Sequence, residues 1–231
     1  MPHSISRSVL AIALVASLPA TLYAQSKPAG KTTPVAFDAD SARLAELPWR
    51  SLGPAVTSGR VVDLAVPEGP KSQISGRLGD LFYVASASGG VWKTTNGGTT
   101  WESIFDHQGA ASIGDIAVAP SNPDIVWVGT GEANNQRSSS WGDGVYKSEN
   151  GGKTWTNMGL KKSEHIGRVI VHPTNSQIVL VAAAGPLWGA GGDRGLFRTT
   201  DGGRTWKNVK NIDIHTGFTD VIFDPTNPDV I

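Results

Sequence analysis

Short apolar runs, each ended by a turn, recur along the chain from about residue 59 onward. The pairs Val91-Trp92, Val145-Tyr146 and Leu196-Phe197 each precede a stretch that contains Asn-Gly-Gly or Asp-Gly-Gly. Asn or Asp followed by glycine is a tight-turn signal, because the side chain caps turn N–H groups and glycine accepts positive φ at no steric cost. Each copy, with apolar or β-branched residues beside its turn, therefore predicts a β-hairpin.

These turns belong to a motif, Ser/Thr-x-Asp/Asn-Gly-Gly-x-Thr-Trp, that occurs at 94–101, 148–155 and 199–206. The closing tryptophans are separated by 54 and then 51 residues, and a period of this length indicates a repeat architecture. We expect each tryptophan to fold back over its turn and bury a large aromatic face. The expected structural residues of the repeat are Asn96, Gly98, Trp101, Asn150, Gly152, Trp155, Asp201, Gly203 and Trp206.

A second hairpin recurs between these turns. An apolar run, a turn rich in Pro, Asn and Asp, and another apolar run occupy 114–129, 167–182 and 220–230. The first prolines of these three turns are 53 and 52 residues apart, which matches the first motif. One period therefore holds four strands, A to D, and four antiparallel strands per repeat are the blade of a β-propeller.

The predicted fold is all-β, a partial β-propeller at 49–231 with four-stranded antiparallel blades, of which about three and a half are present. We predict blades at about 59–105, 113–158 and 166–209, and the start of a fourth at 218–231. Because a propeller needs roughly four to eight blades to close, we expect an N-terminal fragment of a longer protein. The remaining blades of that protein would then be partners of this chain.

The first 24 residues are expected to be a secretory signal peptide. Arg7 supplies a positive start, residues 9–18 are a short apolar run, and Ala24 is a small residue at the expected cleavage point. The run is too short for a membrane-spanning helix, although an apolar helix of the mature fold is an alternative. Residues 25–48 are expected to be a flexible linker. The chain has no cysteine, so a secreted or periplasmic protein must be stable without disulfides.

The charge and the motifs of the chain reduce the number of function classes to consider. The chain has 20 Lys+Arg and 20 Asp+Glu, a formal net charge of zero that predicts neither a nucleic-acid partner nor an anionic membrane surface. The 28 glycines and 8 tryptophans are typical of a turn-rich β protein. Histidines show no metal-ligand spacing, and no Walker loop, Gly-x-Ser-x-Gly motif or dinucleotide fingerprint occurs. We therefore expect neither a metal nor a cofactor.

Function is expected on the B–C loops and D–A connections, at the end of the blades opposite the A–B turns and the Gly-Gly turns. Loops that vary on a rigid scaffold are where binding usually resides. The loop at 130–144 gathers amides, carboxylates, a guanidinium and a tryptophan, groups that suit sugar hydroxyls or a peptide backbone. The alternative is a solvated loop held by its own hydrogen bonds. The candidate ligand-binding residues are Glu132, Asn134, Asn135, Arg137, Trp141, Asp143 and, on the next blade, Trp188, which could equally be a packing residue.

The starts of the A strands form another charged set. Asp115, Arg168 and Asp220 stand five residues before the shared prolines, and Arg60 lies near the equivalent place in the first blade. Because the A strand of a propeller is innermost, these charges would line the central channel. They could serve a ligand or pair with each other as salt bridges, and we favour pairing.

The three Gly-Gly turns resemble the Asp-box, or bacterial-neuraminidase repeat, of sialidases, some xyloglucan-cleaving glycoside hydrolases and sortilin-like propellers. The resemblance implies that these turns are structural and lie on the outer rim, on the face opposite the ligand site. Over about 49–231 the chain looks most like the sortilin-type N-terminal propeller of large exported bacterial proteins, which are often labelled glycosyl hydrolases.

Two functions remain open. One is a binding or scaffolding propeller that recognises a peptide or a glycan, and the other is a glycoside hydrolase, which needs two carboxylates flanking the cleaved bond. The resemblance implies a catalytic Asp just before a Gly-Gly in the first blade, but the segment 85–90 has Ala or Ser there and no acid. No catalytic residue is therefore predicted. Glu132 and Asp143 are possible acids, and the partner of either would lie beyond this chain.

Overall fold

The structure is a computed structural model, and it describes residues 59–68, 79–134, 136 and 138–231. The predicted signal peptide and linker lie outside the described residues. All the described residues belong to one compact unit. Among them, no helix is long and apolar enough to cross a membrane.

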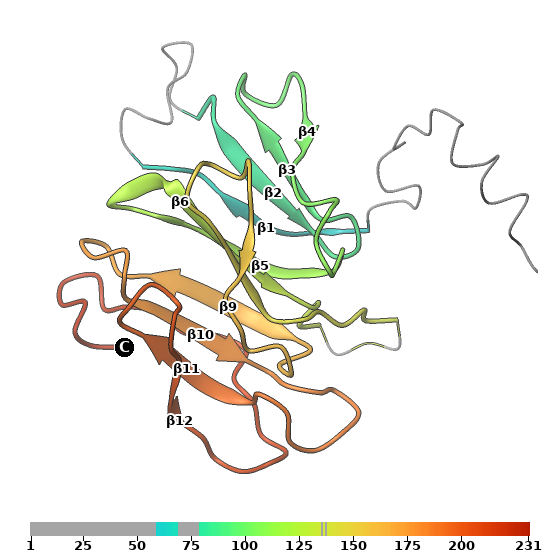
Figure 1. Ribbon diagram of the computed structural model, residues 1–231, viewed down its shortest axis with the longest axis vertical. Helices are drawn as coiled ribbons and strands as arrows, with labels where there is room; N and C mark the ends of the chain where they lie inside the picture. Colours follow the sequence, from blue (N-terminus) through green and yellow to red (C-terminus); the bar gives the residue numbers. More distant parts are fainter. Residues whose placement is uncertain (1–58, 69–78, 135, 137) are drawn as a thin grey trace, which may run out of the picture. The chain divides into compact units, whose positions relative to one another are not determined.

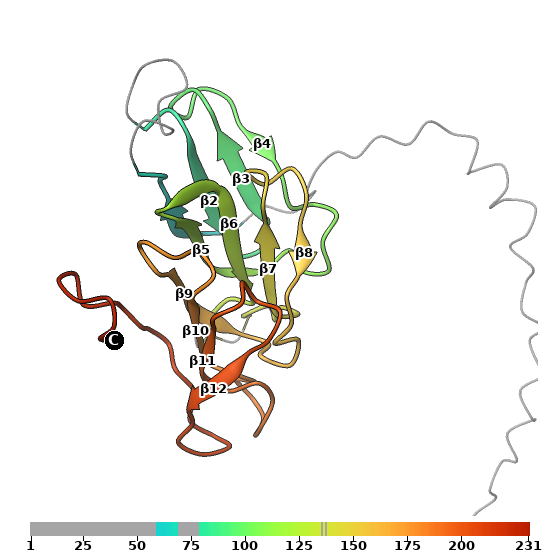
Figure 2. The same cartoon turned by 60° about the vertical axis from the view of Figure 1, so that its left-hand side comes forward.

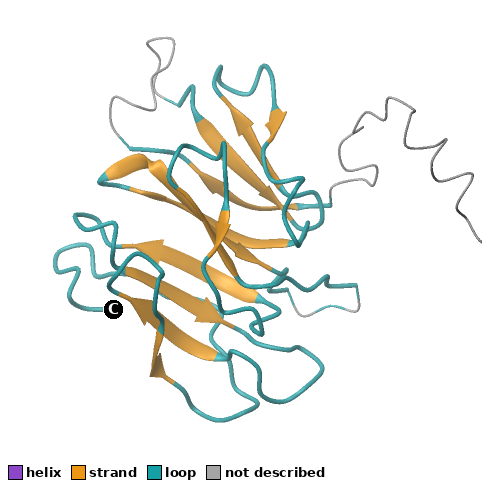
Figure 3. Ribbon diagram, viewed as in Figure 1, coloured by secondary structure: helices purple, strands orange, loops and turns teal. Residues whose placement is uncertain are grey.

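The described residues form strands and no helix, and every strand belongs to one of three four-stranded antiparallel sheets (Figure 3). The first sheet, blade 1, contains β1 (Val61–Ala65), β2 (Phe82–Ser86), β3 (Val91–Thr94) and β4 (Glu102–Ser103). Blade 2 contains β5 (Ile113–Ala119), β6 (Asn122–Thr130), β7 (Val145–Ser148) and β8 (Thr156–Asn157). Blade 3 contains β9 (Ile166–Val171), β10 (Val179–Ala183), β11 (Gly195–Thr199) and β12 (Lys207–Lys210). The strands of each sheet follow chain order, which confirms the prediction of an all-β, partial propeller with four-stranded blades.

Blade 2 lies between the other two sheets (Figures 1 and 2), and strand β6 is buried on both faces. Val126 and Val128 pack in a core shared with blade 1, whereas Ile125 and Trp127 pack in a core shared with blade 3. Successive side chains of a strand point to opposite faces, so this run of apolar residues fills two cores at once. The hydrophobic cores are thus the interfaces between consecutive blades.

The three Gly-Gly turns have the same hydrogen bonds in each blade. In the second copy, Gly152 N donates to Ser148 Oγ at 2.8 Å, and Thr154 N donates to Asn150 Oδ1 at 2.9 Å. The same two bonds recur in the first and third copies at 2.8–3.0 Å. Gly151 and Gly152 have φ of 67° and 89°, in the left-handed region that only glycine adopts freely. We call 94–101, 148–155 and 199–206 the repeated turns.

Two of the three tryptophans that close the repeated turns also join neighbouring blades. Trp155 Nε1 donates to Ile104 O of the preceding blade at 2.7 Å, and Trp206 Nε1 donates to Met158 O at 2.8 Å. Trp101 makes an edge-to-face contact with Phe82 of its own blade and is 42% exposed. Trp155 and Trp206 therefore each connect their blade to the preceding one, and each also packs over its own turn.

The segment at 218–231, which was predicted to begin a fourth blade, contains no strand, and none of the described residues supplies a strand to pair with it there. It nevertheless repeats the contacts of the earlier blades. Phe218 N donates to Ala183 O at 3.1 Å, and Asp224 N donates to Val230 O at 2.9 Å, as His172 N does to Ile178 O at 3.0 Å. The A–B turn thus forms from local interactions, whereas a strand requires a partner.

Candidate functional site

The B–C loops of blades 2 and 3, residues 131–144 and 184–194, flank the same D–A connection at 158–165. Gly142 N donates to Glu164 O in that connection at 2.7 Å. We call the two loops and the connection together the loop face. It lies at the opposite end of the blades from the repeated turns, because antiparallel strands place alternate connections at opposite ends.

The connection between the two loops holds two non-glycine residues in the left-handed region. Leu160 and Glu164 have φ of 54° and 55°. Such a conformation costs on the order of 1–3 kcal/mol and persists only where the surroundings impose it. Here Leu160 is buried in the core, and Asp193 of the blade 3 loop binds Lys162 twice, through its N–H and through its carboxylate. The connection is therefore fixed from both sides.

Glu132, predicted as a ligand-binding residue, is only 3% exposed and ties three blades together. Its carboxylate forms an ion pair with Arg60, its N–H donates to Ser112 Oγ at 3.0 Å, and its carbonyl lies 2.7 Å from His165 Nδ1. These three partners are the residues immediately before β1, β5 and β9. Burial lowers the pKa of His165, which favours the neutral ring. Glu132 therefore anchors the loop.

The Arg60 guanidinium also holds the tip of the loop. The side-chain oxygens of Asn134 and Gln136 accept hydrogen bonds from it, at 2.8 and 3.1 Å, in the amide orientation that the guanidinium requires. Asn134 was predicted to contact a ligand, and its oxygen is engaged within the protein. Asn135 and Arg137, the other two predicted residues at this tip, lie outside the described residues.

Asp143 fixes the other end of the blade 2 loop. Tyr146 Oη donates to Asp143 Oδ2 at 2.6 Å, and Asp143 N donates to Thr130 Oγ1 at 2.9 Å. Burial and the neighbouring Asp143 raise the pKa of the Tyr146 hydroxyl, so it remains a hydrogen-bond donor. Asp143, which was predicted to bind a ligand, thus holds the end of its own loop in place.

Arg194 is the anchor of the blade 3 loop, and the sequence analysis missed it. Its side chain is buried without a carboxylate partner among the residues that the structure describes. All three guanidinium nitrogens donate to main-chain oxygens, at 2.5–3.4 Å, and these belong to Ala184, Pro186, Gly189, Gly191 and His215. Arg194 stands immediately before Gly195, as Asp143 stands immediately before Gly144, and in both blades this glycine lies at the start of strand C. The shared position could have identified Arg194 as a loop anchor from the sequence.

The two tryptophans of these loops are exposed. Trp141 is 73% exposed and Trp188 is 76% exposed, whereas most tryptophans of a folded chain are largely covered. Trp188 borders a hollow of about 680 Å³ that Pro186, Leu187 and His215 also line. Large rings on anchored loops offer flat apolar surfaces for stacking.

The charged residues of the A strands form salt bridges with each other, as the sequence analysis favoured. Arg168 Nε donates to Asp220 Oδ1 at 2.9 Å, and Arg168 Nη1 donates to Asp115 Oδ1 at 3.4 Å. The assignment of Arg60 to this set is wrong. Asp63 takes the place instead, because β1 and β5 each have a bulge just before Asp63 and Asp115, and Arg60 precedes that bulge.

The inner aspartates connect each blade to the next. Asp63 Oδ2 accepts from Ile116 N at 3.3 Å, and Asp115 Oδ2 accepts from Val169 N at 2.6 Å. Burial raises the pKa of Asp115 to about 8, and the adjacent Asp63 carboxyl adds to the rise. The Val169 N–H and the Arg168 guanidinium favour the ionised carboxylate and oppose this rise. Among the described residues, no group of three His, Cys, Asp or Glu side chains is arranged to hold a metal ion.

No protein-family model matches the chain. A probable oligoxyloglucan-reducing end-specific xyloglucanase of Neosartorya fischeri is 31% identical over 99 residues, 41% of this chain and 10% of that protein. A xyloglucanase of a Paenibacillus species is 25% identical over 143 residues, 56% of this chain and 13% of that protein. The chain thus spans only 10–13% of the length of these curated relatives.

Among solved structures, the crystal structure of an ancestral GH74 enzyme aligns with 72% of this chain and 20% of its own. The TM-score is 0.51 and the sequence identity is 22%. This likeness concerns the fold, and it agrees with three sheets stacked in chain order. The described part of the chain has the β-propeller fold that is also found in the GH74 enzyme.

Proposed function

We propose that this chain is part of a carbohydrate-binding propeller and that its loop face holds a glycan against Trp141 and Trp188. The observation that carries the proposal is the exposure of these two rings, 73% and 76%, on loops that buried residues anchor. Aromatic rings stack on the apolar faces of sugars, and rigid loops reduce the entropy lost on binding. Glu132 and Arg194 supply that rigidity.

The relatives suggest which glycan to test first. Two of them are named as xyloglucanases, so xyloglucan oligosaccharides are the first ligand class to examine. Isothermal titration of the whole chain should then detect binding. Trp141→Ala and Trp188→Ala are each expected to weaken it by about tenfold, which corresponds to about 1.4 kcal/mol.

Trp101→Ala is the matched control, because Trp101 is also exposed but stands at the end with the repeated turns. Its affinity for the oligosaccharide should equal that of the unaltered chain. Equal binding by all three variants would remove the loop face as the glycan site. Binding of a peptide in place of the oligosaccharide, with the same dependence on Trp141, would make a peptide the ligand.

A glycoside hydrolase is the second candidate, and the names of the relatives favour it. The chain itself offers little for this chemistry, since Glu132 is buried in an ion pair and Asp143 accepts from Tyr146. Release of reducing sugar from xyloglucan would be measured for the full-length protein. Hydrolysis that is abolished in Glu132→Gln, with binding retained, would establish the enzyme over the binding module.

We further propose that the repeated turns are Asp-boxes with a structural role, and that residues 1–24 direct export. Support comes from the motif and from the short apolar run after Arg7. Expression in a bacterial host with N-terminal sequencing tests the second point. The mature protein should begin at Gln25 in the periplasm or the medium, and an intact Met1 in the cytoplasm would contradict it.

A further inference from the structure

Residues 160–164 lie between the two loops that carry the exposed tryptophans, and we call this segment the floor. Gly142 of the blade 2 loop donates its N–H to Glu164 O at 2.7 Å. Asp193 of the blade 3 loop donates its N–H to Lys162 O at 3.0 Å, and its carboxylate accepts from Lys162 N at 2.9 Å. Hydrogen bonds therefore fix both loops to the same five residues.

The floor is held in a conformation that its residues do not adopt freely. Leu160 and Glu164, at its two ends, are the only non-glycine residues in the left-handed region among those that the structure describes. The connection between blades 1 and 2, residues 104–112, contains no such residue. Strain of this kind persists where the surroundings impose it, and it is concentrated at functional sites. The strained connection is thus the one that separates the two tryptophan-bearing loops.

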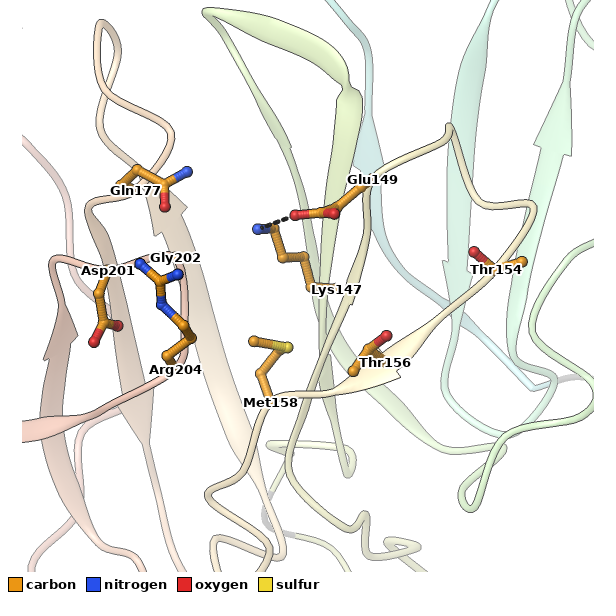
Figure 4. A pocket seen from close by; sticks show the side chains of 9 residues that line it. All are labelled: Lys147, Glu149, Thr154, Thr156, Met158, Gln177, Asp201, Gly202 and Arg204. Carbon is orange, nitrogen blue, oxygen red and sulfur yellow. Dashed lines mark hydrogen bonds and ion pairs between the residues drawn. The ribbon is translucent and has the colours of Figure 1, made fainter.

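The floor presents two ammonium groups to solvent. Lys161 and Lys162 are exposed, and neither side chain forms a hydrogen bond or ion pair with any residue that the structure describes. Lys147 is different, because in the pocket beside the repeated turn of blade 3 its Nζ lies 2.6 Å from the carboxylate of Glu149 (Figure 4). The floor lysines therefore keep their N–H donors available to a ligand.

The charges at the floor cancel. The two ammonium groups of Lys161 and Lys162 are balanced by the two carboxylates of Glu164 and Asp193. The carboxylate of half-buried Glu164 accepts no hydrogen bond from the part of the chain that the structure describes. A surface with free donors, a free acceptor and no net charge suits hydroxyl groups, which both donate and accept, better than it suits an ion.

We propose that the floor and the two tryptophans form one continuous site for an uncharged glycan. The rings stack on sugars at the two ends, and between them Lys161 and Lys162 donate to hydroxyl oxygens while Glu164 accepts from a hydroxyl. This inference rests on the proposed function, in which a glycan lies against Trp141 and Trp188. It adds the charge class of the ligand and the residues that contact its hydroxyls, which orient a ligand more specifically than stacking does.

Isothermal titration of the whole chain with a xyloglucan oligosaccharide tests the floor. Lys161→Ala/Lys162→Ala should weaken binding about tenfold, because it removes hydrogen bonds from charged donors. Lys161→Arg/Lys162→Arg keeps N–H donors at both positions and should retain most of the affinity. The matched control is Lys153→Ala/Arg204→Ala, which removes two exposed cations beside the repeated turns and should leave the affinity unchanged (Figure 4).

Salt and ligand charge test the ligand class. The affinity should not change as the salt concentration is raised, and oligogalacturonate of equal length should bind no more tightly than the neutral oligosaccharide. One continuous site also predicts one oligosaccharide bound per chain.

The floor proposal is overturned by full affinity in the alanine variant, by an equal loss in the control, by two oligosaccharides bound per chain, or by tighter binding of oligogalacturonate. In each of these cases a loss of binding in Trp141→Ala and Trp188→Ala would leave the proposed function in place. Normal binding by both tryptophan variants would instead overturn the proposed function itself.

Discussion

The two ends of the blades differ in how much their connections resemble one another. At one end, the repeated turns have the same hydrogen bonds and the same glycine conformations in all three blades. At the other end, the B–C loops occupy 87–90, 131–144 and 184–194 and share neither length nor anchor. The repeated turns of blades 2 and 3 each meet the preceding blade through the same tryptophan hydrogen bond, whereas the loops expose Trp141 and Trp188 to solvent. The turns that pack against a neighbouring blade are therefore alike in sequence and structure, whereas the loops proposed to bind a ligand differ from blade to blade.

The largest effect is expected where a repeated turn meets the core. Gly203 has φ of 93°, and a Cβ there would lie 2.7 Å from Cη2 of the buried Trp127. Gly203→Ala should therefore lower the free energy of unfolding by about 3 kcal/mol, through backbone strain together with the clash. Urea unfolding measures this.

Gly191 is the matched control on the loop face. It has φ of 79°, and nothing lies within 4 Å of its added Cβ. Gly191→Ala should cost only about 1 kcal/mol, from the backbone alone. Equal losses in the two variants would mean that the two ends do not differ in the way described.

A smaller effect is expected from removal of a loop anchor. Arg194→Gln leaves most of its carbonyl partners without a donor and should lower the free energy of unfolding by about 2 kcal/mol. Hydrogen exchange should quicken mainly at 184–194, and oligosaccharide binding through Trp188 should weaken. Arg198→Gln, which alters an exposed arginine on the neighbouring strand, should change neither quantity. A uniform rise of exchange across all three blades would contradict a local anchor.

The smallest effect concerns the inner strands and depends on pH. The pKa of Asp115 is about 8 in the folded chain against an ordinary value of 3.8, so folding is coupled to retention of a proton. This contribution to stability is complete below about pH 4 and is lost as the pH rises to about 8. Asp115→Asn mimics the protonated form beside Asp63 and Val169, and it should remove the decline.

The difference between Asp115→Asn and the unaltered chain should therefore be near zero at pH 4 and on the order of 1 kcal/mol in favour of the variant at pH 8. This is less than the roughly 5 kcal/mol that the full pKa shift implies, because the variant also loses the ion pair with Arg168. Urea unfolding at a series of pH values measures it, while xyloglucan binding by both chains should be the same. A difference that does not change with pH would show that Asp115 is ionised throughout.

Local patterns predicted the blades, because each repeated turn and each Pro/Asn turn is formed by residues close in the chain. The roles of the loop residues could not be predicted in this way, because they depend on partners that are distant in the sequence. Glu132 is anchored by Arg60, Ser112 and His165, which only the packing of three blades brings together. Likewise, the bulge in β1 puts Asp63 at the place where Arg60 was expected.

The most direct test measures unfolding free energy and xyloglucan affinity on two tryptophan variants, Trp155→Ala and Trp141→Ala. Trp155 is packed between blades and Trp141 is 73% exposed on a loop. We predict that Trp155→Ala loses about 3 kcal/mol of stability, whereas Trp141→Ala loses less than about 0.5 kcal/mol and binds about tenfold more weakly. Trp141→Ala that unfolds the chain, or Trp155→Ala that weakens binding without loss of stability, would contradict the division between the two ends of the blades.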